Sequence, residues 1–437
     1  MRLMGRGGTS LPGKLAMKVS PDLLGELSRN VATIIVTGTN GKTTTTRMMG
    51  QCLSDAGIDY FTNKTGANLM SGILTEFCMN SSPAGKPKRK YALIECDEAA
   101  FRQTGKYLNA KLVLVTNVFR DQLDRFGEVT HTLSCLRDGI DDSKNAIICL
   151  NADCSLSVSL ADGLDREIIY HGSNIPLSEK SIPEVSDATQ CIRCKGNYTY
   201  TYRTYGHLGG FRCEKCGFQR PNPFVAVVEV VKLDQLQSDV VIEIDGKAYP
   251  FSINLPGGYN IYNAAGTVAA AYKLGISSEV IQSALSTFKG GFGRMESFFV
   301  NEKRYQIILV KNPAGCNQVL TYLAEIDTPI ALVICLNDLF ADGTDTSWIW
   351  DVNFEMLEAL DCLESLYISG TRADEMALRL KYAGVPLEKM TVEKESSKLL
   401  DRLGEQSSDV YIVPTYTAML ELRDIICKKY GLDNFWE

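Results

Sequence analysis

Hydrophobic residues follow two alternating patterns over the first 180 residues. Short runs of β-branched and other apolar residues predict buried strands, and stretches with helical spacing lie between most of them. Apolar strands that alternate with helices predict a parallel sheet covered by helices on both faces. The predicted strands are Thr33–Thr37, Tyr91–Cys96, Leu112–Thr116, Ala146–Leu150 and Ile168–Tyr170, with a short helix before them at Pro21–Ser28.

The pattern is interrupted between residues 185 and 222 and then resumes. Two further strands that return to the first sheet are expected, followed by an alanine-rich helix and a glycine-rich joint. A second α/β unit with helix-rich spacing follows, which again favours a parallel sheet. The segments are strands Phe224–Val231 and Val240–Ile244, helix Tyr259–Leu274, joint Gly290–Arg294, strands Ile307–Val310, Ile330–Leu336, Leu366–Ser369 and Val410–Val413, and helix Ala373–Tyr382. We therefore expect an α/β protein with an N-terminal segment (1–30), a central domain (31–296) and a Rossmann-like C-terminal α/β domain (297–437).

The first predicted strand leads into a turn with two glycines and then into a helix that is expected to cover Thr44–Asp55. Such a turn binds phosphate, because backbone N–H groups surround the anion and the helix dipole favours negative charge. Lys42 is expected to reach the outer phosphates and the Thr43 hydroxyl to hold Mg²⁺. Val36 stands where the strict P-loop pattern has glycine, so an ordinary strand–turn–helix corner is the alternative. The predicted nucleotide-binding residues of this loop are Gly38, Thr39, Asn40, Gly41, Lys42, Thr43 and Thr44.

Carboxylates follow the next predicted strand, which ends at Glu95 and Cys96. In open α/β sheets ligands gather at the carboxyl ends of the strands, so Glu95 is placed to hold Mg²⁺ opposite Thr43. An acidic surface cluster at the end of the strand is the alternative.

Composition and charge narrow the class of protein. The chain has 437 residues, 45% of them hydrophobic, and a net charge of −7, which disfavours a general nucleic-acid binder. It shows no apolar run that could span a bilayer and no apolar signal core at its start, so a cytoplasmic protein is expected. Four basic residues near the start could contact lipid headgroups or form a solvated tail; they are Arg2, Arg6, Lys14 and Lys18.

Four of the 14 cysteines form two Cys-x-x-Cys pairs that are separated by 18 residues. This spacing is typical of a structural zinc site, with ligands Cys191, Cys194, Cys213 and Cys216. The inserted zinc ribbon (about 188–221) is too small to bury a core, so the metal would supply its folding energy. Basic residues and tyrosines around it suggest a surface for nucleic acid, a phosphorylated substrate or a partner, but a purely structural ribbon is favoured.

Six segments together resemble the Mur ligase family of ATP-dependent ligases in peptidoglycan precursor synthesis. They are Thr37–Thr44, Glu95, Asp121–Gly127, Asn151–Asp153, Tyr259–Ala265 and Gly293–Glu296. The resemblance implies a Mur-ligase-type P-loop domain that binds ATP and Mg²⁺. It implies that Asn263 contacts adenine and that Arg294 belongs to the arginine motif before the last domain.

Several features depart from the standard Mur ligases. Gln122 replaces a histidine that holds a second metal, and Arg137 falls where a carbamylated lysine is expected. The nucleotide-sugar domain is missing before the ATP loop, and the cysteine insertion is foreign to these enzymes. These features are similar to the Mur-ligase-like subunits of lipid II isoglutaminyl synthases, as are the segments Lys311–Gly315, Asn337-Asp338, Ala341–Trp350 and Gly370–Ala373.

This resemblance implies an ATP-dependent carbon–nitrogen ligase that converts D-glutamate in the lipid II stem peptide to D-isoglutamine. The α-carboxylate would become an acyl phosphate, with Lys42 and Glu95 as catalytic residues. Ammonia would come from a glutamine amidotransferase subunit in a heterodimer at the inner face of the membrane. Asp345 is expected to contact the catalytic histidine of that partner, and Asp342 and Asp351 are the alternative residues. The non-functional alternative is that these carboxylates form a solvated acidic loop. Trp348 and Trp350 are expected as interface anchors or core residues.

Two other functions compete with this one. The first is a Mur-family or folylpolyglutamate-type ligase that adds an amino acid, and the missing sugar-nucleotide domain disfavours it. The second is a zinc-ribbon ATPase that binds nucleic acid, and the acidic net charge disfavours it.

Overall fold

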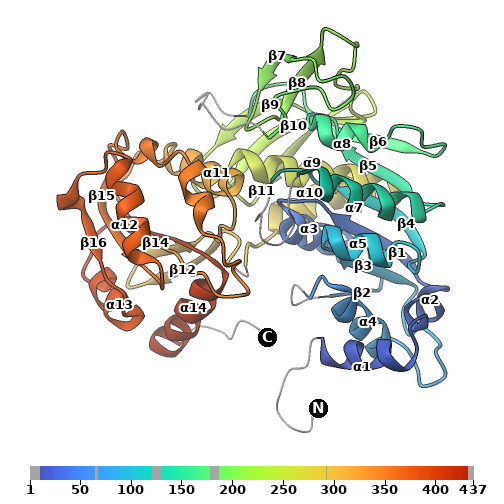
Figure 1. The fold of residues 1–437 in the computed structure, drawn as a ribbon, viewed down its shortest axis with the longest axis horizontal. Helices are drawn as coiled ribbons and strands as arrows, with labels where there is room; N and C mark the ends of the chain where they lie inside the picture. Colours follow the sequence, from blue (N-terminus) through green and yellow to red (C-terminus); the bar gives the residue numbers. More distant parts are fainter. Residues whose placement is uncertain (1–9, 64–66, 121–128, 178–186, 292, 432–437) are drawn as a thin grey trace.

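The computed structural model describes residues 10–63, 67–120, 129–177, 187–291 and 293–431. Two sheets form two lobes that lie side by side, and a small two-stranded ribbon projects from the first lobe (Figure 1). None of the helices in these ranges is long and apolar enough to cross a membrane.

The first lobe contains a nine-stranded sheet in which the first strand of the chain lies near the middle. The sheet order is β11-β10-β9-β6-β5-β4-β1-β3-β2. Neighbouring strands run parallel from β2 to β9, and β10 and β11 continue as antiparallel strands at one edge. Its strands are β1 (Ala32–Thr37), β2 (Tyr60–Thr62), β3 (Tyr91–Glu95), β4 (Ala110–Val115), β5 (Ile147–Asn151), β6 (Ile168–Ser173), β9 (Val225–Leu233), β10 (Ser238–Ile244) and β11 (Lys247–Ile253). The predicted parallel sheet and the return of the chain after residue 222 are confirmed.

Helices cover both faces of this sheet. From β1 to β2 the chain moves along the sheet in one direction, and from β3 to β4 it moves in the other, so right-handed crossovers place α3 and α5 on opposite faces. Helix α3 packs against α9 and α10, whereas α5 packs against α7 and α4, and α1 lies on α4. The helices are α1 (Leu11–Val19), α2 (Leu23–Ser28), α3 (Lys42–Asp55), α4 (Met70–Met79), α5 (Glu98–Thr104), α7 (Val129–Asp142), α8 (Ser155–Ser159), α9 (Gly258–Lys273) and α10 (Ser278–Thr287).

The second lobe contains a six-stranded sheet in the order β12-β13-β17-β14-β15-β16, parallel except for β12. Its strands are β12 (Glu296–Val300), β13 (Lys303–Ile307), β14 (Ile330–Cys335), β15 (Leu363–Ser369), β16 (Met390–Val392) and β17 (Asp409–Pro414). Its helices are α11 (Pro313–Leu323), α12 (Ala373–Tyr382), α13 (Ser396–Gly404) and α14 (Tyr416–Tyr430), with 3₁₀-helices at Ser347–Asp351, Phe354–Leu357 and Leu387–Lys389.

One predicted strand in this lobe is wrong. The prediction placed a strand at Ile307–Val310, but β13 ends at Ile307. The Leu309 N–H donates to the Gly293 carbonyl in the joint, while Ile308 and Val310 bond to the neighbouring strand and its end. The chain therefore stays beside β17 after β13 ends, while Ile308, Leu309 and Val310 line a cavity between the lobes.

The ribbon consists of β7 (Tyr198–Arg203) and β8 (Gly209–Cys213), which pair antiparallel. Its buried side chains form a small cluster that is completed by Val158 of α8, which agrees with a ribbon too small to bury a core of its own; the ribbon residues are Cys191, Tyr198, Phe211, Cys213 and Phe218. One cysteine from each Cys-x-x-Cys pair belongs to this set of side chains, which agrees with a fold that depends on the cysteine cluster.

Candidate active site

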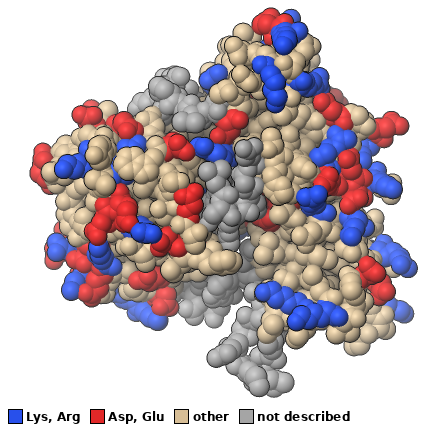
Figure 2. Space-filling view, in the orientation of Figure 1, with Lys and Arg blue, Asp and Glu red and all other residues tan. Residues whose placement is uncertain are grey.

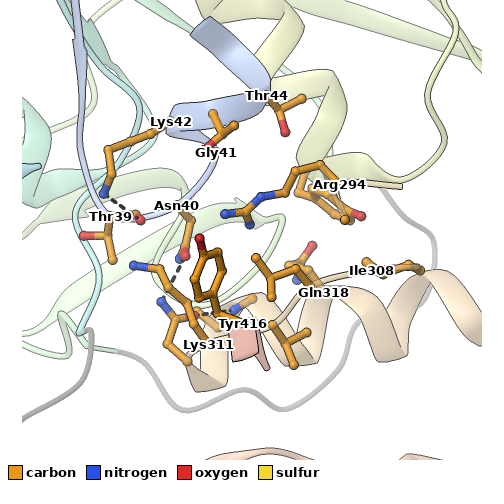
Figure 3. Close-up of a pocket in the computed structure, with 18 of the residues that line it drawn as sticks. Thr39, Asn40, Gly41, Lys42, Thr44, Arg294, Ile308, Lys311, Gln318 and Tyr416 are labelled. Carbon is orange, nitrogen blue, oxygen red and sulfur yellow. Dashed lines mark hydrogen bonds between the residues drawn. The ribbon is translucent and has the colours of Figure 1, made fainter. Parts of the chain in front are cut away.

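A cavity of about 590 Å³ lies between the two lobes. Its walls come from the loop after β1, the ends of β3 and β4, the start of α9, the joint and several segments of the second lobe. Figure 3 shows Arg294 reaching from the joint into the space between the loop and the second lobe. Most of the predicted nucleotide-site residues line this cavity, namely Thr39, Asn40, Gly41, Lys42, Thr43, Thr44, Glu95, Asn263 and Arg294.

The loop after β1 is held in shape by the end of β4. The Thr39 N–H donates to the Asn117 carbonyl, and the Asn40 N–H donates to Asn117 Oδ1 at 3.0 Å. Thr116 Oγ1 donates to the Asn40 carbonyl at 2.7 Å. Gly38 has φ +112°, and a Cβ there would lie 2.6 Å from Thr116 Oγ1, so only glycine fits. These bonds use the N–H groups of Thr39 and Asn40 and fix the conformation of the loop, which leaves the N–H groups at the start of α3 to face the cavity.

The N-terminus of α3 faces the cavity without a side-chain cap. Its cap residue is Gly41, with φ +83°. A Cβ on Gly41 would lie 2.1 Å from Asn263 Oδ1, which also accepts a bond of 3.4 Å from Thr45 Oγ1. Asn263 on α9 therefore packs directly on the loop. The uncapped N–H groups of the first turn and the helix dipole suit an anionic ligand such as phosphate.

Lys42 curls back along the loop and forms a buried ion pair. Its Nζ lies 3.0 Å from Glu98 Oε2, with side chains 8% and 2% exposed. It also donates to the Gly38 carbonyl at 2.5 Å. Glu98 was not predicted as a site residue, although it belongs to the run of carboxylates that follows β3. The pair holds the ammonium group next to the loop that it would serve.

Glu95 and Thr43 offer oxygen ligands from two adjacent elements. Glu95 pairs with Val36 in the parallel register of β3 and β1, so its carboxylate lies beside the loop. It is 5% exposed, and Asn68 Nδ2 donates to its Oε1 at 3.3 Å. A buried carboxylate and a half-buried hydroxyl beside a phosphate loop fit Mg²⁺, which prefers such oxygen ligands together with phosphates and water.

Arg294 brings a positive charge to the same cavity. Its Nε is buried and has no hydrogen-bond partner in the part of the chain that the structure describes. Burial lowers the pKa of Arg294, and the charge of Glu95 opposes that shift. A half-buried guanidinium on the cavity wall, with an unused Nε donor, fits an anionic substrate group.

The second lobe closes the cavity through α11. Asn312 caps this helix, since its Oδ1 accepts from the Gly315 N–H, and its Nδ2 donates to Asn40 Oδ1 at 2.9 Å. That bond links the second lobe directly to the loop after β1. Lys311, Gln318 and Tyr416 line the same side (Figure 3). Asn312 was not predicted as a site residue, because its contact with Asn40 depends on how the lobes pack.

The predicted Asn-Ala-Asp turn supports the site from behind. Asn151 Nδ2 donates to the Thr116 carbonyl at 3.0 Å. Asp153 is fully buried and accepts from the Ser173 N–H, from the Tyr262 hydroxyl at 2.6 Å and from Arg220 Nε at 2.5 Å. Burial raises the pKa of Asp153, and the charge of Arg220 opposes that shift. This network ties the ribbon to α9 and to the loop.

The four cysteine sulfurs form one cluster, with every pair within 4.8 Å. The Cys191–Cys216 and Cys194–Cys213 sulfurs are 3.6 Å and 3.5 Å apart, close to the spacing around a tetrahedral zinc ion. Burial raises the pKa of Cys191, but the N–H groups of Cys194 and Arg193 outweigh it, so the net effect lowers that pKa. The donor set therefore fits Zn²⁺.

Several basic residues around the ribbon form ion pairs with carboxylates of this chain. Arg193 pairs with Asp162, Arg220 with Asp153, and Arg212 with Glu214 at 3.7 Å. These pairs reduce the positive surface that a nucleic acid would need.

The three candidate carboxylates of the second lobe have different surroundings. Asp342 is buried and accepts from the N–H and hydroxyl of Thr417 in the first turn of α14. Asp351 pairs with Arg120 Nη2 at 2.6 Å across the lobes. Asp345 is half-buried and accepts from the Ser347 N–H at 2.8 Å, within its own loop. The described contacts of Asp342 and Asp351 reach other elements of the fold. The described contact of Asp345 stays within its own loop.

The two tryptophans of this loop differ as well. Trp348 is buried, whereas Trp350 is 52% exposed and its ring lies 5.9 Å from that of Tyr382. Trp348 is thus a core residue, and Trp350 belongs to the surface.

Two further predictions concern a second metal. The Asp121–Gly127 stretch, with Gln122, lies outside the described residues. Arg137 on α7 pairs with Asp141 at 2.9 Å and donates to the Asp162 carbonyl near α8. It does not line the cavity described above.

Comparison with known proteins agrees with the geometry of both lobes. A family model for the Mur ligase middle domain matches residues 36–189, and a model for the MurT ligase C-terminal region matches residues 309–419. Lipid II isoglutaminyl synthase (glutamine-hydrolyzing) subunit MurT from Streptococcus pneumoniae is 36% identical over 98% of this chain and 94% of that protein. The Staphylococcus aureus subunit of the same name is 33% identical over 98% and 95%. UDP-N-acetylmuramate–L-alanine ligase from Fusobacterium nucleatum is 26% identical over 70% of this chain and 56% of that protein.

Solved structures share the fold. MurF from Acinetobacter baumannii superposes with a TM-score of 0.69 at 16% identity, over 95% of this chain and 80% of that one. A pseudomurein peptide ligase type C from Methanothermus fervidus gives 0.65 at 21% identity, over 92% and 79%. These likenesses confirm a Mur-ligase-like α/β fold with parallel-rich sheets. With the full-length identity above, they show that the chain belongs to the MurT family of Mur-ligase-like proteins.

Proposed function

We propose that this chain is the ATP-using subunit of a lipid II isoglutaminyl synthase, which amidates the α-carboxylate of D-glutamate in the stem peptide. The observation that carries the proposal is one cavity in which Lys42, Glu95 and Arg294 meet in a chain of full-length MurT likeness. The amino-acid-adding Mur ligases are similar over less of their length, which disfavours that alternative. The acidic net charge and the paired basic residues of the ribbon disfavour the nucleic-acid alternative.

The cavity residues have distinct tasks in this reaction. Mur ligases use ATP and Mg²⁺, and bound Mg²⁺ would neutralise phosphate charge when held by Thr43 and Glu95. The N–H groups at the start of α3 and Lys42 would bind the outer phosphates, and Asn263, which packs on the loop from α9, would contact adenine. Arg294 aligns the substrate carboxylate with the terminal phosphate of ATP. A carboxylate oxygen attacks the terminal phosphorus, ADP leaves, and ammonia then displaces phosphate from the acyl carbon.

The nitrogen would arrive from a glutamine amidotransferase subunit that docks near Asp345. Asp342 and Asp351 bond to Thr417 and Arg120 elsewhere in the fold, whereas half-buried Asp345 bonds to the Ser347 N–H within its own loop. Exposed apolar residues lie in the neighbouring sequence and on α12, as a docking surface would require. They are Leu339, Phe340, Trp350, Leu378 and Tyr382.

The ribbon would bind Zn²⁺ through its four cysteines and serve as structural support. Its bond from Arg220 to Asp153 transmits that support to the loop-bearing core. We also propose the division into residues 31–296 and 297–437, with the ribbon at about 188–221, as the functional domains.

The test is amidation of lipid II with free ammonium, ATP and Mg²⁺. Thr43→Ala and Glu95→Gln are expected to lower the rate by about 100-fold or more, because each removes a group that stabilises phosphate charge. Glu229→Gln, an exposed change on β9, is the matched control and is expected to leave the rate unchanged. Full activity of Thr43→Ala would refute the site. A requirement for an added amino acid in place of ammonium would favour the alternative ligase function.

A further inference from the structure

Helix α1 carries an apolar stripe on its exposed face. Leu11, Leu15 and Val19 are 42%, 55% and 87% exposed. Their spacing of four residues places them on one side of the helix, one above the other. Isolated exposed apolar residues need no explanation, but three in register on one short helix form a surface.

The opposite face of α1 fixes the helix to the first lobe. The Gly13 N–H donates to Thr75 Oγ1 on α4 at 2.9 Å. A Cβ on Gly13 would lie 1.9 Å from the Ser71 carbonyl oxygen, so the two helices are in close contact. Ala16 and Met17 pack against the main core. The stripe is therefore presented outward by a helix that is anchored along its other side.

Positive charge flanks the stripe. Lys14 and Lys18 are exposed on α1, and residues 10–20 contain no acidic side chain. Figure 2 shows basic side chains gathered over α1 at the lower edge of the molecule. This local charge is opposite in sign to the net charge of −7 of the whole chain. An apolar face bordered by lysines is complementary to an anionic lipid surface, into which apolar side chains insert while ammonium groups meet headgroups.

The helix that carries α1 also leads to the active-site cavity. Asn68 and Leu69, which immediately precede α4, line that cavity, and Asn68 donates to Glu95. Leu69 is 58% exposed. A surface bound at α1 would thus lie at the end of a rigid connection to the cavity wall.

We propose that α1 is an interfacial helix that docks the first lobe on an anionic lipid bilayer. The proposed membrane binding is supported by the apolar stripe and the two lysines of α1 and does not depend on the proposed function. Its value for catalysis rests on the proposed function, because a lipid-linked substrate would then be captured next to the cavity.

The experiment measures binding of the full chain to vesicles of equimolar phosphatidylglycerol and phosphatidylcholine. Leu15→Ser and the double change Lys14→Gln/Lys18→Gln are compared with the parent. Each lysine near such a surface contributes about fivefold in affinity, so the double change is expected to weaken binding about 25-fold. Leu15→Ser is expected to weaken it about tenfold. Leu236→Ser and Lys247→Gln, at the far edge of the first sheet, are matched exposed controls and should bind as the parent does.

A second readout separates docking from catalysis. Ammonium-driven amidation of lipid II is measured in detergent micelles and in the same vesicles. The α1 variants should show a raised KM in vesicles and parental rates in micelles. Failure of the parent to bind vesicles, or equal binding to pure phosphatidylcholine, would overturn the proposal while leaving the proposed function intact. Loss of a self-associated dimer, or of amidotransferase binding, in Leu15→Ser would also overturn it, because the stripe would then serve a protein partner. Vesicle binding without any amidation would instead count against the proposed function.

Discussion

Replacing Gly41 by alanine tests how closely the phosphate loop and α9 are fitted. Two separate costs arise at this position. The backbone at Gly41 has φ +83°, a left-handed conformation that costs a residue with a Cβ about 1–2 kcal/mol. The added Cβ would also lie 2.1 Å from Asn263 Oδ1, so loop or side chain must move. Overpacking of this kind costs about 1–3 kcal/mol more.

Gly57→Ala isolates the first cost from the second. Gly57 follows the same helix α3 and has φ +70°, but a Cβ there meets nothing within 4 Å. The unfolding free energy of both variants should therefore fall by the backbone cost of about 1–2 kcal/mol. Only Gly41→Ala should lose the further 1–3 kcal/mol, roughly, that overpacking costs. Because the loop must shift to relieve the contact, the Kd for ATP should rise at least about tenfold in Gly41→Ala and stay unchanged in Gly57→Ala.

The assays are chemical unfolding without nucleotide and calorimetric titration with ATP and Mg²⁺. The double variant Gly41→Ala/Asn263→Gly removes the obstructing side chain and should recover about 1–3 kcal/mol of unfolding free energy relative to additivity. Equal destabilisation of Gly41→Ala and Gly57→Ala, with parental ATP affinity in both, would refute the reasoning about the loop.

Three further predictions address other parts of the fold. Glu98→Gln leaves the Lys42 ammonium buried without its carboxylate, so unfolding free energy should fall by about 3–5 kcal/mol, and ATP should raise the melting temperature of the variant more than that of the parent; an unchanged stability would show that the pair is dispensable. Removing Zn²⁺ with a chelator, or Cys194→Ser, should lower zinc content and expose the ribbon to limited proteolysis between residues 188 and 221; undiminished protease resistance of the metal-free chain would contradict a structural role. Burial lowers the pKa of His171 from 6.5 to about 4, so its stabilising contribution is complete above pH 6.5 and is lost as the pH falls toward 4. Between pH 6.5 and about pH 5, His171 should therefore lower the unfolding free energy by about 2 kcal/mol. Urea titrations should show a smaller fall in His171→Phe. The same pH profile of unfolding free energy in the variant and the parent would contradict the assignment.

Periodicity was enough to predict most of the strands that carry the site. Ala32–Thr37 and Tyr91–Glu95 are apolar runs bounded by polar turns. Such runs are typical of central parallel strands, because these strands are buried on both faces of the sheet. The same rule placed one strand too late at Ile307–Val310, because Ile308, Leu309 and Val310 are apolar residues that line the cavity after β13 has ended. A run of apolar residues predicts that a segment is buried, but it does not predict which part of the fold packs against that segment.

The missed contacts are those that depend on tertiary packing. The bond from Asn312 to Asn40 joins residues 272 positions apart, and no local pattern encodes it. The buried pair of Lys42 and Glu98 arises because β1 and β3 are neighbours in the sheet. Helix α1 was missed because its glycine and proline weaken a helical pattern, whereas close packing on α4 requires that glycine.

We propose that this chain activates a carboxylate with ATP while a partner supplies ammonia near Asp345. Amidation of lipid II by the complex with the amidotransferase subunit is measured with glutamine and, separately, with free ammonium, for the parent and for Asp345→Asn. We expect glutamine-driven amidation to fall by about 100-fold or more in Asp345→Asn and ammonium-driven amidation to stay at the parental rate. Undiminished glutamine-driven amidation by the variant, or equal loss of both activities, would contradict it.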